Sequence, residues 1–234
     1  MEMLLKAARL EKAEVDTSEL ELINRQTLRP LAAEEVFCFR LAACDNQVDR
    51  DGERFTEATL QQLAELYVGR PILLDHDWSA KSQTARVYAA AVEAAGTTQQ
   101  LVLRCYMPRS QQTESTITAI EAGILRECSV GCAVRRVTCS ICGADQRTVC
   151  CEHYSGREYN GQVCHMDLED AVDAYEVSLL PVPAQPAAGV TKSKRYGGKE
   201  KAADPHEDRD PGWQAEAMLA LENEKYKYNG GTEA

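Results

Sequence analysis

The segment between residues 138 and 166 constrains the fold most, because it holds many cysteines and few large apolar side chains. It opens with Cys139-Ser-Ile-Cys142-Gly, a turn in which the glycine lets both thiolates face one metal ion. Cys151-Glu-His153 follows and completes a set of three cysteines and one histidine. A segment with so few apolar residues to bury needs another source of folding free energy, such as a bound metal ion. We therefore expect a structural zinc ion held by Cys139, Cys142, Cys151 and His153.

Other residues of this segment offer alternative ligands, namely Cys150, Cys164 and His165. Buried thiols, or a disulfide in an oxidising particle, are the alternative to a metal site. The first residues, Met1-Glu-Met-Leu-Leu-Lys, are too charged for a secretory signal, so we expect a reducing compartment. In such a compartment, clustered cysteines are more often metal ligands than disulfides, and this chain has ten cysteines.

Composition narrows the class of protein further. The net charge of −11 argues against a protein held to nucleic acid by bulk charge. The sequence contains no run of 18 apolar residues, so no membrane span is expected. An apolar share of 44% suffices for a core, which must be mostly aliphatic because only three Phe and two Trp occur. One domain with an appendage is the expected organisation.

Hydrophobic periodicity and turn residues predict the elements of that domain. Helices are expected over residues 56–68, capped by Thr56, and 114–122. Strands are expected over residues 35–41, 71–74, 86–94, 101–107, 128–137 and 174–182. We divide the chain into an N-terminal arm (1–33), a main domain (34–190, with the Cys-rich insert at 138–166), a flexible linker (191–212), and a C-terminal helix and tail (213–234).

Two motifs carry the residues of a serine hydrolase. His76 ends the apolar run Pro-Ile-Leu-Leu-Asp-His and precedes every histidine of the Cys-rich segment, so it is the candidate general base. Ser129 lies in Glu-Cys-Ser-Val-Gly131, where a glycine would let the substrate backbone approach the candidate nucleophile. Backbone N–H groups near Ser129 are candidate oxyanion donors. A third motif, Tyr175-Glu-Val-Ser-Leu-Leu-Pro, supplies a carboxylate.

In order and spacing, these motifs resemble the prohead (capsid maturation) proteases of tailed bacteriophages, which are relatives of the herpesvirus assemblin proteases. The resemblance runs from about Glu35 to about Val190 and includes Asp49-Arg-Asp-Gly52-Glu-Arg-Phe and Arg86-Val-Tyr-Ala-Ala-Ala-Val. It implies an α+β fold in which helices surround a small, mainly antiparallel β-barrel. The zinc-knuckle-like insert would be an addition that most simple prohead proteases lack.

The resemblance also implies roles and partners. Ser129 would form an acyl-enzyme, His76 would carry the proton, and Glu176 would accept the Nδ1 proton of His76. The enzyme would cut scaffolding protein or segments of the capsid protein, and then itself, in the host cytoplasm and the procapsid interior. Cleavage within the linker would release the helix that begins at Trp213. Because the herpesvirus relatives work as dimers, a homo-oligomer is an open expectation.

Several alternatives stay open at this point. Asp77 or Glu127 could replace Glu176, although neighbours of His76 in an extended strand would point away from its ring. Cys132 could replace Ser129 as nucleophile, while Arg135 and Arg136 are interpreted as solvent-exposed strand charges. The rival class is a non-catalytic phage assembly protein whose zinc insert docks a partner. Nucleic-acid binding by the insert is a third possibility, but few basic and aromatic residues are present there to support it: Arg147, Arg157 and Tyr159.

Overall fold

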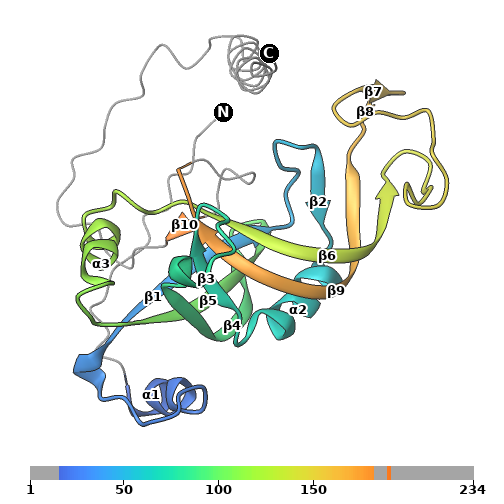
Figure 1. Cartoon of the computed structure of the whole chain (residues 1–234). Helices are drawn as coiled ribbons and strands as arrows, with labels where there is room; N and C mark the ends of the chain where they lie inside the picture. Colours follow the sequence, from blue (N-terminus) through green and yellow to red (C-terminus); the bar gives the residue numbers. More distant parts are fainter. Residues whose placement is uncertain (1–15, 182–188, 191–234) are drawn as a thin grey trace, which may run out of the picture. The chain divides into compact units, whose positions relative to one another are not determined.

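The computed structural model describes residues 16–181 and 189–190 (Figure 1). The predicted linker and C-terminal helix, and with them the proposed self-cleavage segment, lie outside the described residues. Within the described residues, no helix is both long enough and apolar enough to cross a membrane. All of the described residues belong to the first of the chain's two compact units.

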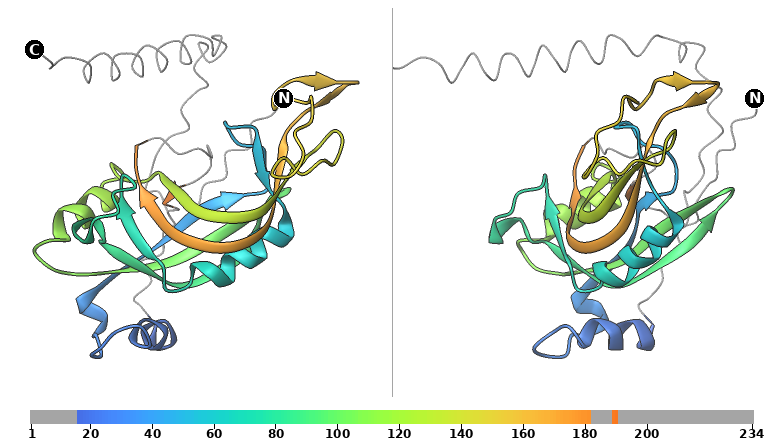
Figure 2. Two further views of the ribbon diagram at one scale, coloured as in Figure 1. Left: turned by 45° about the vertical axis from the view of Figure 1, so that its right-hand side comes forward. Right: turned by 90° about the vertical axis from the view of Figure 1, so that its right-hand side faces the viewer.

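One mixed sheet of eight strands forms the centre of the fold. Seven strands follow the order β10-β1-β5-β4-β3-β9-β2, and β6 pairs with β9 as a branch. The strands are β1 (Val36–Asp45), β2 (Glu53–Phe55), β3 (Pro71–Leu74), β4 (Ala85–Ala95), β5 (Thr98–Pro108), β6 (Cys128–Cys139), β9 (Met166–Leu179) and β10 (Gly189–Val190). Figure 2 shows β6 and β9 as two long strands that curve together along their whole length.

The α+β class is confirmed, but the expected closed barrel is wrong. Within the described residues, the sheet remains open, since no ladder joins β6 to β1. The two strands instead approach through a side chain, as the Cys128 thiol lies 3.5 Å from the carbonyl oxygen of Ala42. At Leu41 and Ala42, the edge of β1 that does not pair with β5 is occupied by β10. The sheet is also less uniform than expected, because β9 runs parallel to both β2 and β3.

Helix α2 (Glu57–Tyr67) confirms the predicted helix and packs its apolar face on the sheet. The Thr56 side chain caps it by accepting a hydrogen bond from the N–H of Thr59 at 3.3 Å. Leu60, Leu63 and Tyr67 are completely buried in a mainly aliphatic core, as composition predicted. Helix α3 (Glu114–Glu121) is confirmed as well.

Part of the predicted N-terminal arm is ordered. Helix α1 (Thr17–Asn24) begins at the cap residue Asp16. Its buried Ile23 packs with Val36, Tyr88 and Tyr106 in a second, smaller apolar cluster. The short helical turns η1 (Ala33–Glu35) and η2 (Ala80–Ser82) complete the helical elements.

The predicted strand over residues 174–182 begins eight residues too late, because β9 starts at Met166. The missed part is charged and therefore does not read as a strand. It is nevertheless stabilised by its ladder with β6 and by ion pairs such as Arg54–Asp167, at 2.7 Å. The Cys-rich segment thus connects the end of β6 to the start of β9. It contains the small hairpin β7 (Glu158–Tyr159) and β8 (Gln162–Val163).

Candidate active site and metal centre

His76 lies in a strained turn directly after β3. Both Asp75 and His76 have φ near +53°, a left-handed conformation that residues other than glycine rarely adopt. Backbone contacts to β9 hold the turn: the N–H of Asp75 donates to Leu179 O at 3.1 Å, and that of His76 donates to Ser178 Oγ at 3.0 Å. The expectation of an extended backbone around His76 is therefore wrong.

The structure brings His76 and Glu176 together. His76 Nδ1 lies 2.8 Å from Glu176 Oε1, although the two residues are 100 positions apart in the chain. The glutamate side chain is 2% exposed and the histidine side chain 42% exposed. A buried carboxylate requires hydrogen-bond donors, and His76 Nδ1–H supplies one. The opposite edge of the imidazole, which carries Nε2, is left for contact with solvent. In this arrangement His76 could act as a base on the solvent side, while the buried Glu176 carboxylate orients its ring.

Ser129 reaches the same face of the sheet through the β6–β9 ladder. Ser129 lies opposite Ser178, and Gly131 lies opposite Glu176. Directly opposite residues have Cβ atoms about 4.5–5.5 Å apart and share one face of the sheet. The intervening Val130 is opposite Val177, which is part of the apolar core on the other face. Ser129 is therefore a diagonal neighbour of Glu176 across the ladder, at a separation of about 7–8 Å for such pairs. Within the described residues, no hydrogen bond of the Ser129 hydroxyl is present.

Gly131 is required by the glutamate opposite it. A Cβ atom at this position would lie only 2.7 Å from Glu176 Oε1. The carbonyl oxygen of Gly131 accepts a hydrogen bond from the hydroxyl of Tyr67 at 3.0 Å. Burial raises the pKa of Tyr67, so the phenol stays protonated and keeps donating. Helix α2 thereby fixes the β6 backbone beside the candidate site.

We predict that Gly131→Ala destabilises the protein by about 1–3 kcal/mol, because the new methyl group forces the Glu176 carboxylate aside. Urea unfolding measures this loss of free energy. In a Glu176→Ser background the same substitution should cost clearly less, since the clashing oxygen is gone. Equal losses in the two backgrounds would contradict the clash.

A cavity of about 460 Å³ runs along β6 and reaches Ser129. Its β6 wall includes the consecutive residues 128–134. The turn between β1 and β2 contributes Asp49 and Asp51, and Glu53 at the start of β2 also lines it. Arg147 of the Cys-rich segment also lines it. Burial raises the pKa of Asp49 and of Glu53, and nearby carboxylates add to both effects. His76 and Glu176 are not among the lining residues, so the cavity meets the candidate site at Ser129.

The geometry disfavours the alternative catalytic residues. Burial raises the pKa of the Cys132 thiol to about 11, which leaves little thiolate at neutral pH. Asp77 accepts hydrogen bonds from Ser79 and Ser82 in its own turn. Glu127 pairs with Arg126 at 2.8 Å. As predicted, Arg135 and Arg136 are exposed.

The predicted metal ligands form one cluster. The ligand atoms of Cys139, Cys142, Cys151 and His153 all lie within 4.8 Å of one another, so the group could hold a metal ion. In the described residues, the buried Nδ1 of His153 has no hydrogen-bond partner, as expected of an atom meant for a metal. Burial raises the pKa of the Cys139 thiol, but the backbone N–H groups of Cys142 and Ile141 outweigh it and lower that pKa to about 7. A thiolate is the form that binds metals.

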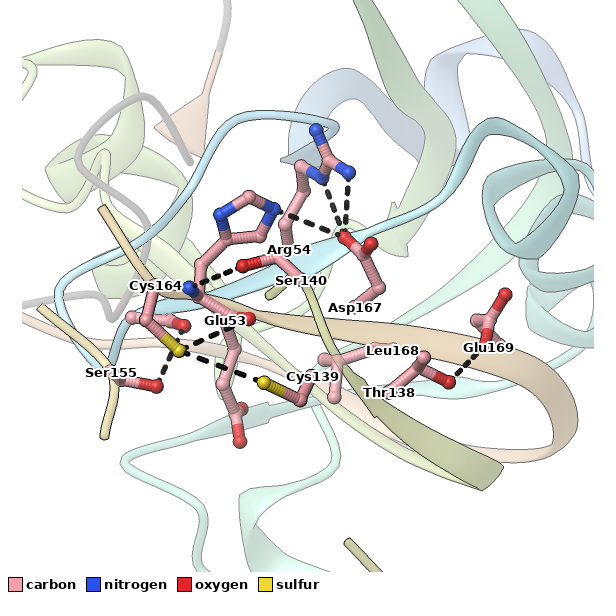
Figure 3. A network of polar contacts seen from close by, with 12 residues as sticks. Glu53, Arg54, Thr138, Cys139, Ser140, Ser155, Cys164, Asp167, Leu168 and Glu169 are labelled. Carbon is pink, nitrogen blue, oxygen red and sulfur yellow. Dashed lines mark hydrogen bonds and ion pairs between the residues drawn. The ribbon is translucent and has the colours of Figure 1, made fainter. Parts of the chain in front are cut away.

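The three alternative ligands lie outside this cluster. Cys150 is exposed. The buried Cys164 thiol lies 3.9 Å from that of Cys139 (Figure 3). Cys164 is nevertheless not among the four clustered residues. His165 Nε2 lies 3.4 Å from Asp167 Oδ1, a distance suited to an ion pair rather than a good hydrogen bond. All ten cysteines are free thiols.

The Cys-rich segment also contacts the wall of the cavity. Ser155 donates a hydrogen bond to the carbonyl oxygen of Gly52 at 3.3 Å, and the N–H of Met166 donates to the same oxygen at 2.9 Å. Gly52 has φ +73°, and a Cβ there would lie 2.7 Å from Ser155 Cβ. The turn that carries the acidic cavity residues is therefore held by the segment that carries the metal ligands.

No family model, curated protein or solved structure matched this chain. The motifs and the geometry described above are therefore the basis for assigning a function.

Proposed function

We propose that this protein is a serine endopeptidase of the phage prohead type, with Ser129 as nucleophile, His76 as general base and Glu176 as the residue that orients the base. The observation that carries this proposal is the 2.8 Å contact between His76 Nδ1 and Glu176 Oε1, with Ser129 as the diagonal neighbour of Glu176 in the β6–β9 ladder. Because the glutamate accepts a hydrogen bond from Nδ1–H, Nε2 at the exposed edge of the ring is the nitrogen left to accept a proton.

The chemistry follows from that arrangement. Ser129 Oγ attacks the peptide carbonyl while its proton passes to His76 Nε2. The imidazolium, stabilised by the buried carboxylate, then gives the proton to the leaving amine. An acyl-enzyme on Ser129 remains, and water activated by the same imidazole hydrolyses it.

The cavity along β6 supports a peptide as substrate. Seven consecutive residues of β6 line it, so an extended peptide could lie beside the strand and pair with its backbone. Such a peptide would pass Ser129. By the family resemblance, the substrates are segments of scaffolding or capsid protein, and also the chain's own linker at residues 191–212.

We further propose that Cys139, Cys142, Cys151 and His153 hold a structural zinc ion. When bound, a zinc ion with four protein ligands supplies folding energy and leaves no open position for water. The Ser155–Gly52 contact and Arg147 connect this segment to the cavity. The metal would therefore hold one wall of the substrate cavity in place.

A fluorophosphonate that labels activated serines tests the catalytic proposal. Intact mass should show one label on the wild type and none on Ser129→Ala or His76→Ala. Ser110→Ala, which removes an exposed serine in the loop before α3, should label like the wild type. A wild type that stays unlabelled, while a reference serine protease in the same tube reacts, would instead favour the non-catalytic assembly protein.

A further inference from the structure

Ser178 lies between the two residues that are proposed to form the base. Its hydroxyl donates a hydrogen bond to Glu176 Oε2 at 2.6 Å. Ser178 Oγ also accepts a hydrogen bond from the backbone N–H of His76 at 3.0 Å. Its side chain is completely buried. One hydroxyl group therefore contacts the acid through its side chain and the base through its backbone.

The Glu176 carboxylate depends on this hydroxyl. Its Oε1 is held by His76, and its Oε2 by Ser178. Within the described residues, no lysine or arginine pairs with this glutamate, which is 2% exposed. A buried carboxylate oxygen without a donor is costly, so loss of the serine hydroxyl would drive the carboxylate to rotate or take up water.

The backbone of His76 depends on Ser178 as well. Two consecutive non-glycine residues with positive φ persist only where the surroundings hold them. The N–H of His76 would lose its acceptor without the Ser178 oxygen. His76 is therefore fixed at two points: its ring by Glu176 and its backbone N–H by Ser178.

We propose that Ser178 is a positioning residue of the active site, which fixes the Glu176 carboxylate and the His76 backbone with a single hydroxyl group. This inference rests on the proposed function. Ser178 lies opposite Ser129 in the β6–β9 ladder, but it is not a second nucleophile. It has no exposed surface, and its proton is donated to the carboxylate.

The test reads the tautomer of His76 by nitrogen NMR of isotopically labelled protein, with Ser129→Ala present in every sample. Because the nucleophile is absent, the readout does not depend on catalysis. With Ser178 intact, neutral His76 should carry its proton on Nδ1, since Glu176 accepts there. With Ser178→Ala, the Nδ1-protonated form should no longer predominate, and His76 should show the mixture of Nδ1-H and Nε2-H tautomers that a free imidazole has.

Two variants guard against misfolding as an explanation. Ser178→Cys nearly keeps the size of the side chain but donates weakly, so it should show the same loss in milder form. Thr59→Val removes another buried hydroxyl, one that donates to β9 at Leu168 O, and should leave the tautomer unchanged. An unchanged His76 tautomer in both Ser178 variants would overturn the proposal, and so would the absence of the Nδ1-protonated form when Ser178 is intact.

Kinetics separates this inference from the proposed function. If the chain cleaves peptides, Ser178→Ala should lower kcat on the order of 10²-fold with little change in KM, because it misplaces the base without touching the substrate. Suppose that Ser178→Ala shifts the His76 tautomer but the wild type takes no fluorophosphonate label. Ser178 would then be shown to fix Glu176 and His76, and the proposed protease activity would be refuted. A wild type that takes the label, with a His76 tautomer that does not change in Ser178→Ala, would support the protease and refute the positioning role of Ser178.

Discussion

Ser129→Ala is expected to abolish all proteolytic processing by this protein. When the chain is produced together with the capsid or scaffolding protein that is proposed as its substrate, intact mass should show shortened products with the wild type and none with the variant. The loss should be roughly 10⁴- to 10⁶-fold, because without the serine hydroxyl no acyl-enzyme forms and His76 has no proton to accept.

Two controls make this result specific. Ser110→Ala should process normally, since that serine lies outside the candidate site. Cys132→Ala should also retain activity, because burial keeps its thiol protonated. Cleavage that persists in Ser129→Ala but disappears in Cys132→Ala would transfer the nucleophile to the cysteine.

Removal of the metal is expected to unfold the Cys-rich segment while most of the sheet survives. A structural zinc site contributes about 10–16 kcal/mol of apparent folding energy, and this segment has few apolar residues to replace it. Elemental analysis should find one zinc per chain in the untreated protein. After chelation, limited proteolysis should cut between β6 and β9 and leave the α2 core intact.

Neighbouring cysteines provide the matched comparison. Cys142→Ser should lose the metal, because its sulfur belongs to the four-residue cluster. Cys150→Ser should keep the metal, because that exposed cysteine lies outside the cluster although it precedes a ligand in the chain. Equal metal content in both variants would contradict the assigned ligand set. Because Ser155 contacts Gly52, loss of metal should also raise KM for a peptide more than it lowers kcat.

Local sequence determined the elements whose stabilisation is local. The helix after Thr56 and the strand Pro71–Leu74 follow from a cap and a short apolar run. The metal cluster was predicted to the residue, because the spacing in Cys139-x-x-Cys142 and Cys151-x-His153 itself brings ligands close together. The start of β9 was missed because its charged residues are held by a partner strand rather than by burial.

Tertiary structure alone decided the geometry of the site. His76 and Glu176 meet across 100 residues only because β3 and β9 run side by side, and the register of β6 places Ser129 and Gly131 beside them. Strand periodicity would have put Ser178 on the face of Glu176, two residues away, but not in contact with His76 N–H. Closure of the sheet was not decided by sequence either. The second edge of β1 pairs with β10, a strand of two residues, and such a long-range pairing depends on how the whole chain packs rather than on any local pattern of residues.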